Sequence, residues 1–146
     1  MTPPASITIC EAPHDSPLYH AAVALRSRVL REPLGLHFTP EQLAAEAGES
    51  HWVAMENATV LGSVSLTADR PPRLRQMAVE ATHQRRGIGS ALLRAAADHA
   101  RASGATCIEL HARVSALPFY LHHGGQIVSA PYREVGLPHR TVRLAL

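Results

Sequence analysis

A short stretch near the middle of the chain carries residues that could bind phosphate. Gln84–Ser90 reads QRRGIGS and stands between an apolar run and a run with helical spacing. The free N–H groups of a first helical turn, and the positive end of the helix dipole, attract anions. Gly87 and Gly89 would let phosphate oxygens approach the backbone, and Arg85 and Arg86 would add positive charge. The same residues could instead form a turn that only needs unusual backbone angles, with solvated arginines.

Two other phosphate-binding motifs do not fit this stretch. A dinucleotide-binding fingerprint needs a third glycine, and Leu92 stands at that position. A Walker A loop needs a lysine before its Ser or Thr, but the chain contains no lysine. The arginine-only, alanine-rich composition is typical of a GC-rich bacterial genome.

The elements that would position this loop follow from the hydrophobic periodicity. Strands are predicted at 6–10, 51–56, 60–68, 73–80, 106–112, 126–135 and 139–146, and helices at 16–31, 39–48, 88–104 and 115–125. The second helix has strong end signals: Thr39 as N-cap, Pro40 in the first turn, Gln42 completing a capping box and Gly48 as the stop. This order predicts an α/β domain with a mixed sheet.

The loop and two flanking motifs resemble the GNAT acyltransferase family. Gln84–Gly89 is similar to the family's Gln/Arg-x-x-Gly-x-Gly/Ala signature, and Met77–Val79 (MAV) precedes it where the family has a bulged strand. The stretch 116–125 (ALPFYLHHGG) is similar to the family's tyrosine motif. The resemblance covers essentially the whole chain. Within the family it is strongest to the ElaA/YjcF-type subgroup, on the stretches LRSRVLREPLG, LRQMAV, LHAR and PYREVGLPH.

The resemblance implies the fold, the co-substrate and its binding residues. The fold would be the GNAT acyl-CoA N-acyltransferase fold, with a mixed six- to seven-stranded sheet flanked by about four helices in one domain, 1–146. The co-substrate would be acetyl-CoA, with no metal. The residues expected to bind it are Met77, Ala78, Val79, Gln84, Arg85, Arg86, Gly87, Ile88, Gly89 and Ser90.

The resemblance also implies direct transfer of an acetyl group to an amine. A backbone N–H near Met77–Val79 would stabilise the oxyanion, and Tyr120 would protonate the departing thiolate. Taken by itself, Tyr120 would be read as a packed aromatic residue with a satisfied hydroxyl. The alternative function is a non-catalytic GNAT-fold module that binds acyl-CoA as a sensor or partner domain.

The general base is less well defined than the acid. Some family members carry a glutamate where this chain has Arg73, so that base cannot be carried over. Strand alternation places Glu109 and His111 on one face, and Glu134 and His139 follow in a turn that the subgroup resemblance places over the acceptor cleft. His111 and Glu134 are the candidate catalytic residues, while Glu109 and His139 are candidate acceptor-binding residues. In the plainer alternative, Glu109 pairs with an arginine and His111 packs or caps.

Several other features have a structural and a functional interpretation. Arg26, Arg28 and Arg31 are expected on a solvated helix face, or at the border of the acceptor site; Arg26 is the candidate acceptor-binding residue among them. The pair His122–His123 lacks a metal-binding pattern and is expected at the surface. Gly125 replaces the family's aromatic residue after the glycine, and Arg113 stands where many members have asparagine.

The bulk composition limits the class of protein. The chain has 146 residues, 46% hydrophobic and 18% charged, with a net charge of +2. No stretch approaches the about 20 apolar residues that span a bilayer, and the start of the chain does not resemble a signal peptide. The arginines are dispersed, which argues against nucleic acid. Cys10 and Cys107 are expected as free thiols. We expect a cytoplasmic protein whose partners are acetyl-CoA and an amine-bearing acceptor, without membrane or nucleic acid, and we leave open a homodimer.

Overall fold

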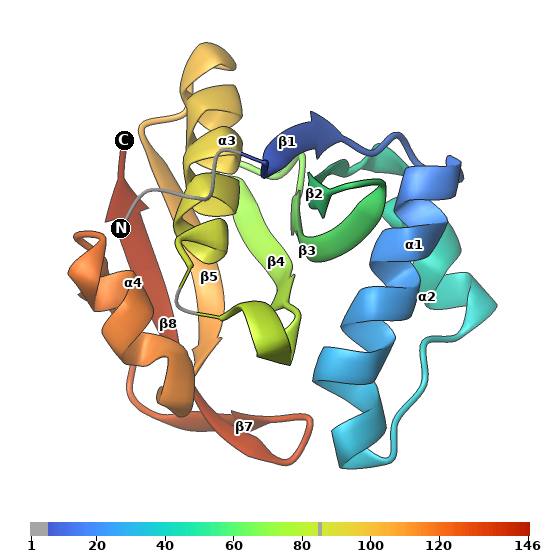
Figure 1. Ribbon diagram of the computed structural model, residues 1–146. Coiled ribbons are helices and arrows are strands. Elements are labelled where there is room, and N and C mark those ends of the chain that lie inside the picture. The colour runs from blue at the N-terminus through green and yellow to red at the C-terminus, as the bar shows by residue number, and fades with distance from the viewer. Residues whose placement is uncertain (1–5, 85) are drawn as a thin grey trace.

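One mixed sheet organises the part of the chain that the computed structural model describes, residues 6–84 and 86–146 (Figure 1). Arg85, a predicted member of the phosphate loop, lies outside the described residues. The strands are β1 (Thr8–Glu11), β2 (Ser50–Glu56), β3 (Thr59–Leu66), β4 (Arg73–Val79), β5 (Cys107–Arg113), β6 (Gln126–Ile127), β7 (Tyr132–Glu134) and β8 (Leu137–Ala145). The helices are α1 (Pro17–Arg26), α2 (Pro40–Ala44), α3 (Ile88–Ala102) and α4 (Leu117–His122).

The strands lie in the order β1-β2-β3-β4-β5-β8-β6, and β7 pairs with β8. All neighbours are antiparallel except β4 and β5, which run parallel. Within the described residues the sheet therefore has eight strands, against the six to seven predicted. The difference arises in the predicted strand 126–135, which divides into β6 and β7. Between them Pro131 has no N–H to donate, and the Ser129 hydroxyl accepts a hydrogen bond from the Thr141 backbone N–H at 2.8 Å.

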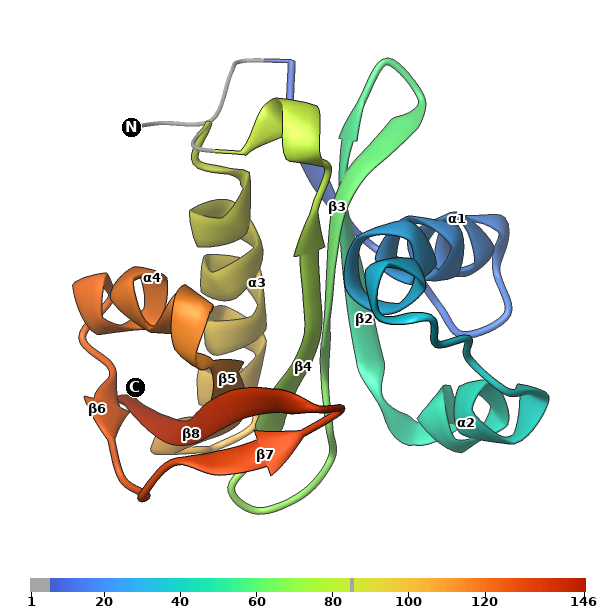
Figure 2. The same ribbon diagram turned by 90° about the horizontal axis from the view of Figure 1, so that it is seen from below.

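Helices cover both faces of the sheet. Helices α3 and α4 lie on one face and α1 and α2 on the other (Figure 2). The predicted apolar stripe of α3 is buried, with Ile88 and Leu92 at 1% and 0% exposure. Gly62 of β3 allows the close approach of this helix, because a Cβ there would lie 2.9 Å from Cγ2 of Ile88. The start of α3 is thereby fixed against the middle of the sheet.

The first helix differs in detail from the prediction. Helix α1 is followed without a break by a π-helical turn, η1 (Ser27–Arg31), and the helical path then ends at Gly35 with a φ of +70°. The capping box of α2 is present as predicted: the Thr39 hydroxyl accepts from the Gln42 N–H, and the Gln42 side chain accepts from the Thr39 N–H. A 3-10 turn, η3 (Ala45–Gly48), completes that helical segment.

Two irregularities of β4 shape the centre of the molecule. Between Ser63 and Ser65 of β3 the register shifts, so that β4 carries one residue more than its partner. At this bulge Gln76 has a φ of +56°, which side-chain-bearing residues rarely adopt. On its other side β4 pairs with β5 only through Arg73 and Leu74. From the bulge onward, the edge of β4 that faces β5 therefore has no strand partner in residues 6–84 and 86–146.

Candidate active site

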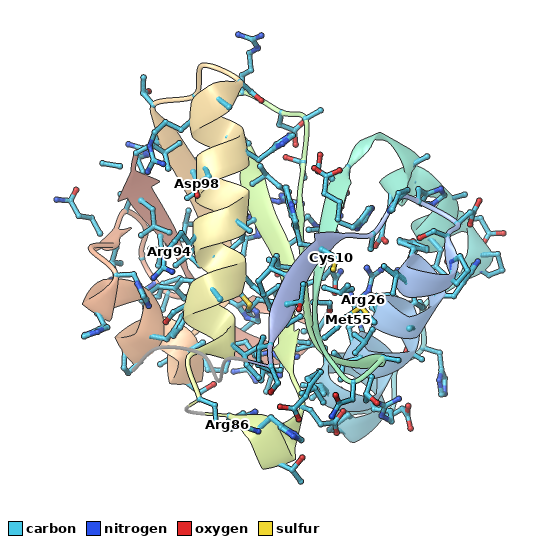
Figure 3. The ribbon with its side chains drawn as sticks, turned by 45° about the horizontal axis from the view of Figure 1, so that its top comes forward. Cys10, Arg26, Met55, Arg86, Arg94 and Asp98 are labelled. Carbon is cyan, nitrogen blue, oxygen red and sulfur yellow. The ribbon has the colours of Figure 1, made fainter. Side chains whose placement is uncertain are left out.

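The loop before α3 presents an uncapped helix end. Gly87 is the N-cap residue, with a φ of +80° that explains the need for glycine. Among the described residues no side chain caps the first turn of α3, and that turn contains no acidic residue. Arg86 lies where α3 begins (Figure 3), with Nη2 3.7 Å from Oε2 of Glu56. The helix end thus keeps its positive dipole and backbone donors available for an anion.

The second glycine of the loop lies against an aromatic ring. A Cβ on Gly89 would lie 3.3 Å from Cε1 and Cζ of Phe119, on α4. The next residue, Ser90, shares a hydrogen bond of 2.9 Å with Nε2 of His123. Of the predicted surface pair, only His122 is exposed, whereas His123 is half-buried and burial lowers the pKa of its imidazole. The loop and the end of α4 therefore form one surface.

The predicted bulged segment leads directly into this loop. Met77 and Val79 are half-buried at the unpaired edge of β4, and Ala78 is buried. The Gln84 side chain donates a long hydrogen bond of 3.4 Å to the Val79 carbonyl. The segment 77–87 thus connects the bulge at Gln76 to the start of α3 at Ile88.

Tyr120 is buried on the same side of the sheet as this loop. Its side chain is 6% exposed and belongs to the main core cluster beneath α3 and α4. Burial raises the pKa of its hydroxyl well above the usual value for tyrosine. The hydroxyl is protonated at neutral pH, as it is in an unperturbed tyrosine.

The glycine at position 125 has a packing reason. A Cβ there would lie 2.7 Å from Cγ1 of Val142 and 2.8 Å from the Tyr120 carbonyl oxygen. The Gly125 N–H also donates to that carbonyl at 2.9 Å, which closes the end of α4. The family's aromatic residue is therefore sterically excluded here.

Three of the predicted site residues come together at the hairpin of β7 and β8. Nδ1 of His111 lies 2.9 Å from Oε1 of Glu134, and Nε2 of His139 lies 3.8 Å from Oε2 of the same carboxylate. His139 is 4% exposed, while His111 and Glu134 are exposed. Tyr132 packs against both rings, stacked on His139 and edge-to-face with His111. We call His111, Glu134 and His139 the hairpin cluster.

Glu109 does not join this cluster. Its carboxylate Oε2 accepts from Nε and Nη2 of Arg143, at 3.0 and 2.6 Å across neighbouring strands. The predicted alternation holds, since Glu109 and His111 lie on the face of β5 opposite the buried Ile108 and Leu110. Of the two interpretations of Glu109, acceptor binding or pairing with an arginine, the structure has the second.

The expectation that Arg26 lies on a solvated face is wrong. Arg26 is 2% exposed and lies between α1 and the sheet (Figure 3). Its Nη2 donates to Oε2 of Glu46 at 2.5 Å, and the Tyr19 hydroxyl donates to Oε1 of the same carboxylate at 2.7 Å. A buried guanidinium needs such a partner, and Glu46 supplies it from η3, 20 residues away in sequence. Arg26 thus ties α1 to η3 and directs its charge toward Glu46.

Arg31, by contrast, faces a cavity that the sequence did not reveal. This cavity of about 160 Å³ lies beside the bulge of β4, and Arg31, Phe38, Arg75 and Gln76 are among its lining residues. Arg113, the family's usual asparagine position, donates from Nη2 to the Leu30 carbonyl at 3.0 Å and so joins the end of β5 to η1. Phe38 carried no motif that could have marked it, and Arg75 lies in the LRQMAV stretch but was not singled out as a site residue.

Within the described residues, no group of His, Cys, Asp and Glu side chains is arranged to hold a metal ion. None of the helices in residues 6–84 and 86–146 has both the length and the apolar character needed to cross a bilayer.

Three features occur together in the described structure: a bulged strand, β4, with a free edge; a parallel neighbour, β5, that pairs with it only at Arg73 and Leu74; and a helix start without a side-chain cap. Together they define the acyl-CoA N-acyltransferase class of fold. Comparison with known proteins agrees, since residues 19–124 match the Acetyltransferase (GNAT) family. The chain therefore belongs to the GNAT acetyltransferase family. No protein with a curated description matches the chain.

Solved structures show the same fold at low sequence identity. A Lactobacillus plantarum protein has 24% identity and a TM-score of 0.82, with 97% of this chain and 99% of that one covered. Escherichia coli ElaA has 16% identity and a TM-score of 0.78, with 94% and 98% covered. A GNAT acetyltransferase from Elizabethkingia anophelis, whose structure contains acetyl-CoA, has 18% identity and a TM-score of 0.74, with 98% and 100% covered.

Proposed function

We propose that the chain is an N-acetyltransferase that uses acetyl-CoA to acetylate a primary amine of a small molecule, peptide or protein. One observation carries the proposal: the free edge of β4 and the uncapped start of α3 are joined by one short segment of the chain, residues 80–87. The first feature suits an extended amide-bearing chain such as pantetheine, and the second suits a pyrophosphate. The Elizabethkingia anophelis relative, with acetyl-CoA in its structure, supports the choice of co-substrate.

The residues of the loop fit the pyrophosphate by their chemistry. The N–H groups of Gly87, Ile88, Gly89 and Ser90 would face its oxygens, with Arg86 adding charge. Arg85 is part of the same proposal, although its position lies outside the described residues. Gln84 would hold the end of β4 in place through its hydrogen bond to Val79.

When bound, acetyl-CoA supplies an activated acyl group as a thioester. A backbone N–H of Met77–Val79 would donate to the thioester carbonyl oxygen and stabilise negative charge as it develops there. The Tyr120 hydroxyl would give its proton to the thiolate that leaves. The amine nitrogen forms the new C–N bond as the C–S bond breaks.

The hairpin cluster provides a route for the proton that the amine must lose. With Nδ1–H donating to Glu134, the neutral His111 ring has its lone pair on Nε2. Nε2 would then accept the amine proton, directly or through water, and the carboxylate would stabilise the imidazolium that results. The buried His139, whose Nδ1 lies 2.9 Å from the Leu137 carbonyl oxygen, lies on the other side of Glu134.

Three wider expectations belong to the same proposal. Residues 1–146 would form a single GNAT domain, act in the cytoplasm and need no partner other than acetyl-CoA and the acceptor. A homodimer is compatible with this proposal but is not required by it.

The test is turnover of acetyl-CoA against a panel of amines and peptides, detected as free CoA thiol. The wild type should release CoA in an amine-dependent manner, and Tyr120→Phe should lower kcat by about 10²- to 10⁴-fold, as for loss of a general acid. The matched control is Tyr132→Phe, which removes a hydroxyl bonded only to Thr141 within the described structure. Binding of CoA without turnover on any amine would contradict catalysis and favour a sensor module.

A further inference from the structure

The cavity beside the bulge of β4 is lined by two arginine side chains. Its lining includes Arg31 and Arg75, with Glu46 as the acidic side chain. Glu46 is already bonded to Arg26 and Tyr19, and Arg75 donates from Nη1 to Oε2 of Glu49 at 2.8 Å. The acidic groups near the cavity are therefore largely occupied by cations other than Arg31.

Arg31 has no ion pair among the described residues, although its surroundings are crowded with cations. Burial and the charges of Arg26, Arg75 and Arg113 lower the pKa of its guanidinium, while the charge of Glu134 acts in the opposite sense. A guanidinium in such surroundings is stabilised by any anion that enters the cavity. The crowding thus favours a negatively charged ligand next to Arg31.

The position of Arg31 is set before any ligand binds. Its guanidinium carbon lies 4.6 Å from the centroid of the Phe38 ring, and that of Arg26 lies at the same distance. Cation–π contact with Phe38 restricts the long side chain, which lines the cavity. A planar guanidinium held in this way suits the two oxygens of a carboxylate.

The cavity is also in the right place relative to the proposed chemistry. Gln76 lines it and directly precedes Met77, where the acyl carbonyl would bind. The hairpin cluster is linked to the same region, because Arg113, paired with His139 across β5 and β8, donates to the carbonyl of Leu30, the residue before Arg31. A small molecule with its anionic end at Arg31 could therefore extend its amine toward the hairpin cluster.

We propose that the acceptor carries a carboxylate and that Arg31, positioned by Phe38, binds it in the cavity beside the β4 bulge. The acceptor class is then a small aminocarboxylate, whose amine is acetylated while its carboxylate is held a few atoms away. This inference rests on the proposed acetyltransferase function for the identity of the reaction. The anion-binding property of the cavity does not depend on turnover.

Binding of N-acetylated products tests the inference without interference from amine titration. The probes are N-acetylglycine, N-acetyl-β-alanine and N-acetyl-4-aminobutyrate, each compared with its uncharged amide by NMR titration, with and without saturating CoA. We expect at least one carboxylate to bind the wild type about 10- to 100-fold more tightly than its amide, as for loss of a hydrogen bond to a charged group. Arg31→Gln should abolish this preference, and Arg31→Lys should restore part of it.

The matched control is Arg28→Gln, three residues earlier in the same π-helical turn. Arg28 is exposed and bonds to Glu80 at 3.0 Å, so the carboxylate preference should be unchanged. Equal binding of acids and amides, absence of binding by all three acids, or a preference that survives Arg31→Gln would overturn the inference. Failure of the acetyltransferase proposal would appear separately, as the absence of CoA release in the turnover assay.

Discussion

The buried pair of Arg26 and Glu46 should be the most sensitive point in the helical layer beside the proposed acceptor cavity. Both side chains are almost fully buried, at 2% and 3% exposure. Glu46→Ala would leave the guanidinium without its carboxylate, and the Tyr19 hydroxyl would keep the longer bond of 3.4 Å to the Leu43 carbonyl. Removing one partner of a buried ion pair costs about 3–5 kcal/mol. This is a large part of a typical free energy of unfolding, about 5–15 kcal/mol.

Equilibrium unfolding in urea measures this cost. Trp52, the only tryptophan, is 5% exposed in the core and should report unfolding by its fluorescence. The control is Asp98→Ala on α3, which removes a pair of similar length, 2.8 Å to Arg101, whose side chains are 64% and 55% exposed. An exposed pair contributes about 0–1 kcal/mol, so this variant should be nearly as stable as the wild type.

A double replacement separates the charge from the volume. Arg26→Met with Glu46→Leu removes both charges and keeps apolar bulk, so we expect it to be more stable than Glu46→Ala alone. The reasoning would be refuted if Glu46→Ala cost less than about 1 kcal/mol, since the uncompensated charge should dominate. It would also be refuted if the double variant were no more stable than the single one.

Three further predictions concern packing, pH and the proton route. Gly125→Ala should lower the free energy of unfolding by about 1–3 kcal/mol, because the new Cβ would overlap the backbone of α4. Gly48→Ala should leave it unchanged, because a Cβ there meets nothing within 4 Å. Equal urea midpoints for the two variants would contradict this packing. Burial lowers the pKa of His51 in the folded protein. Below the usual histidine pKa of about 6.5 the unfolded state therefore binds more protons, and the free energy of unfolding should fall as pH falls. An unchanged pH slope of the unfolding free energy in His51→Gln would exclude this histidine as the cause. His111→Asn should lower kcat at neutral pH and recover part of the rate at higher pH, where the amine loses its proton to solvent; a loss of rate that is the same at every pH would argue against a role in proton removal.

Local sequence signals predicted the loop and the secondary structure well. The capping box of α2, the need for glycine at Gly87 and the alternation along β5 depend on residues within a few positions of one another. The bulge in β4 followed from the family resemblance. These features are decided by backbone conformation, which neighbouring residues largely determine.

The partners of charged side chains could not be predicted in the same way. Glu46 reaches Arg26 across 20 residues, and Arg143 reaches Glu109 across 34. Such pairs depend on strand register and on how the helices pack against the sheet. The cavity at Arg31 is a stronger case, because Phe38 contributes to it from an irregular segment without any motif. The sequence placed Arg26 and Arg31 together, on a solvated face or at the border of the acceptor site, and only the fold separates them.

Calorimetric titration with acetyl-CoA tests the central claim most directly, because it asks whether the β4 edge and the start of α3 bind this molecule. The wild type should bind one equivalent with micromolar-range affinity. Gly89→Trp should lose this binding while keeping the far-UV circular dichroism of the wild type, since the new side chain would fill the surface between the loop and Phe119. Gly48→Trp, at a position with open space, should bind normally. A folded Gly89→Trp protein with undiminished affinity, or a wild type that does not bind acetyl-CoA, would contradict the account.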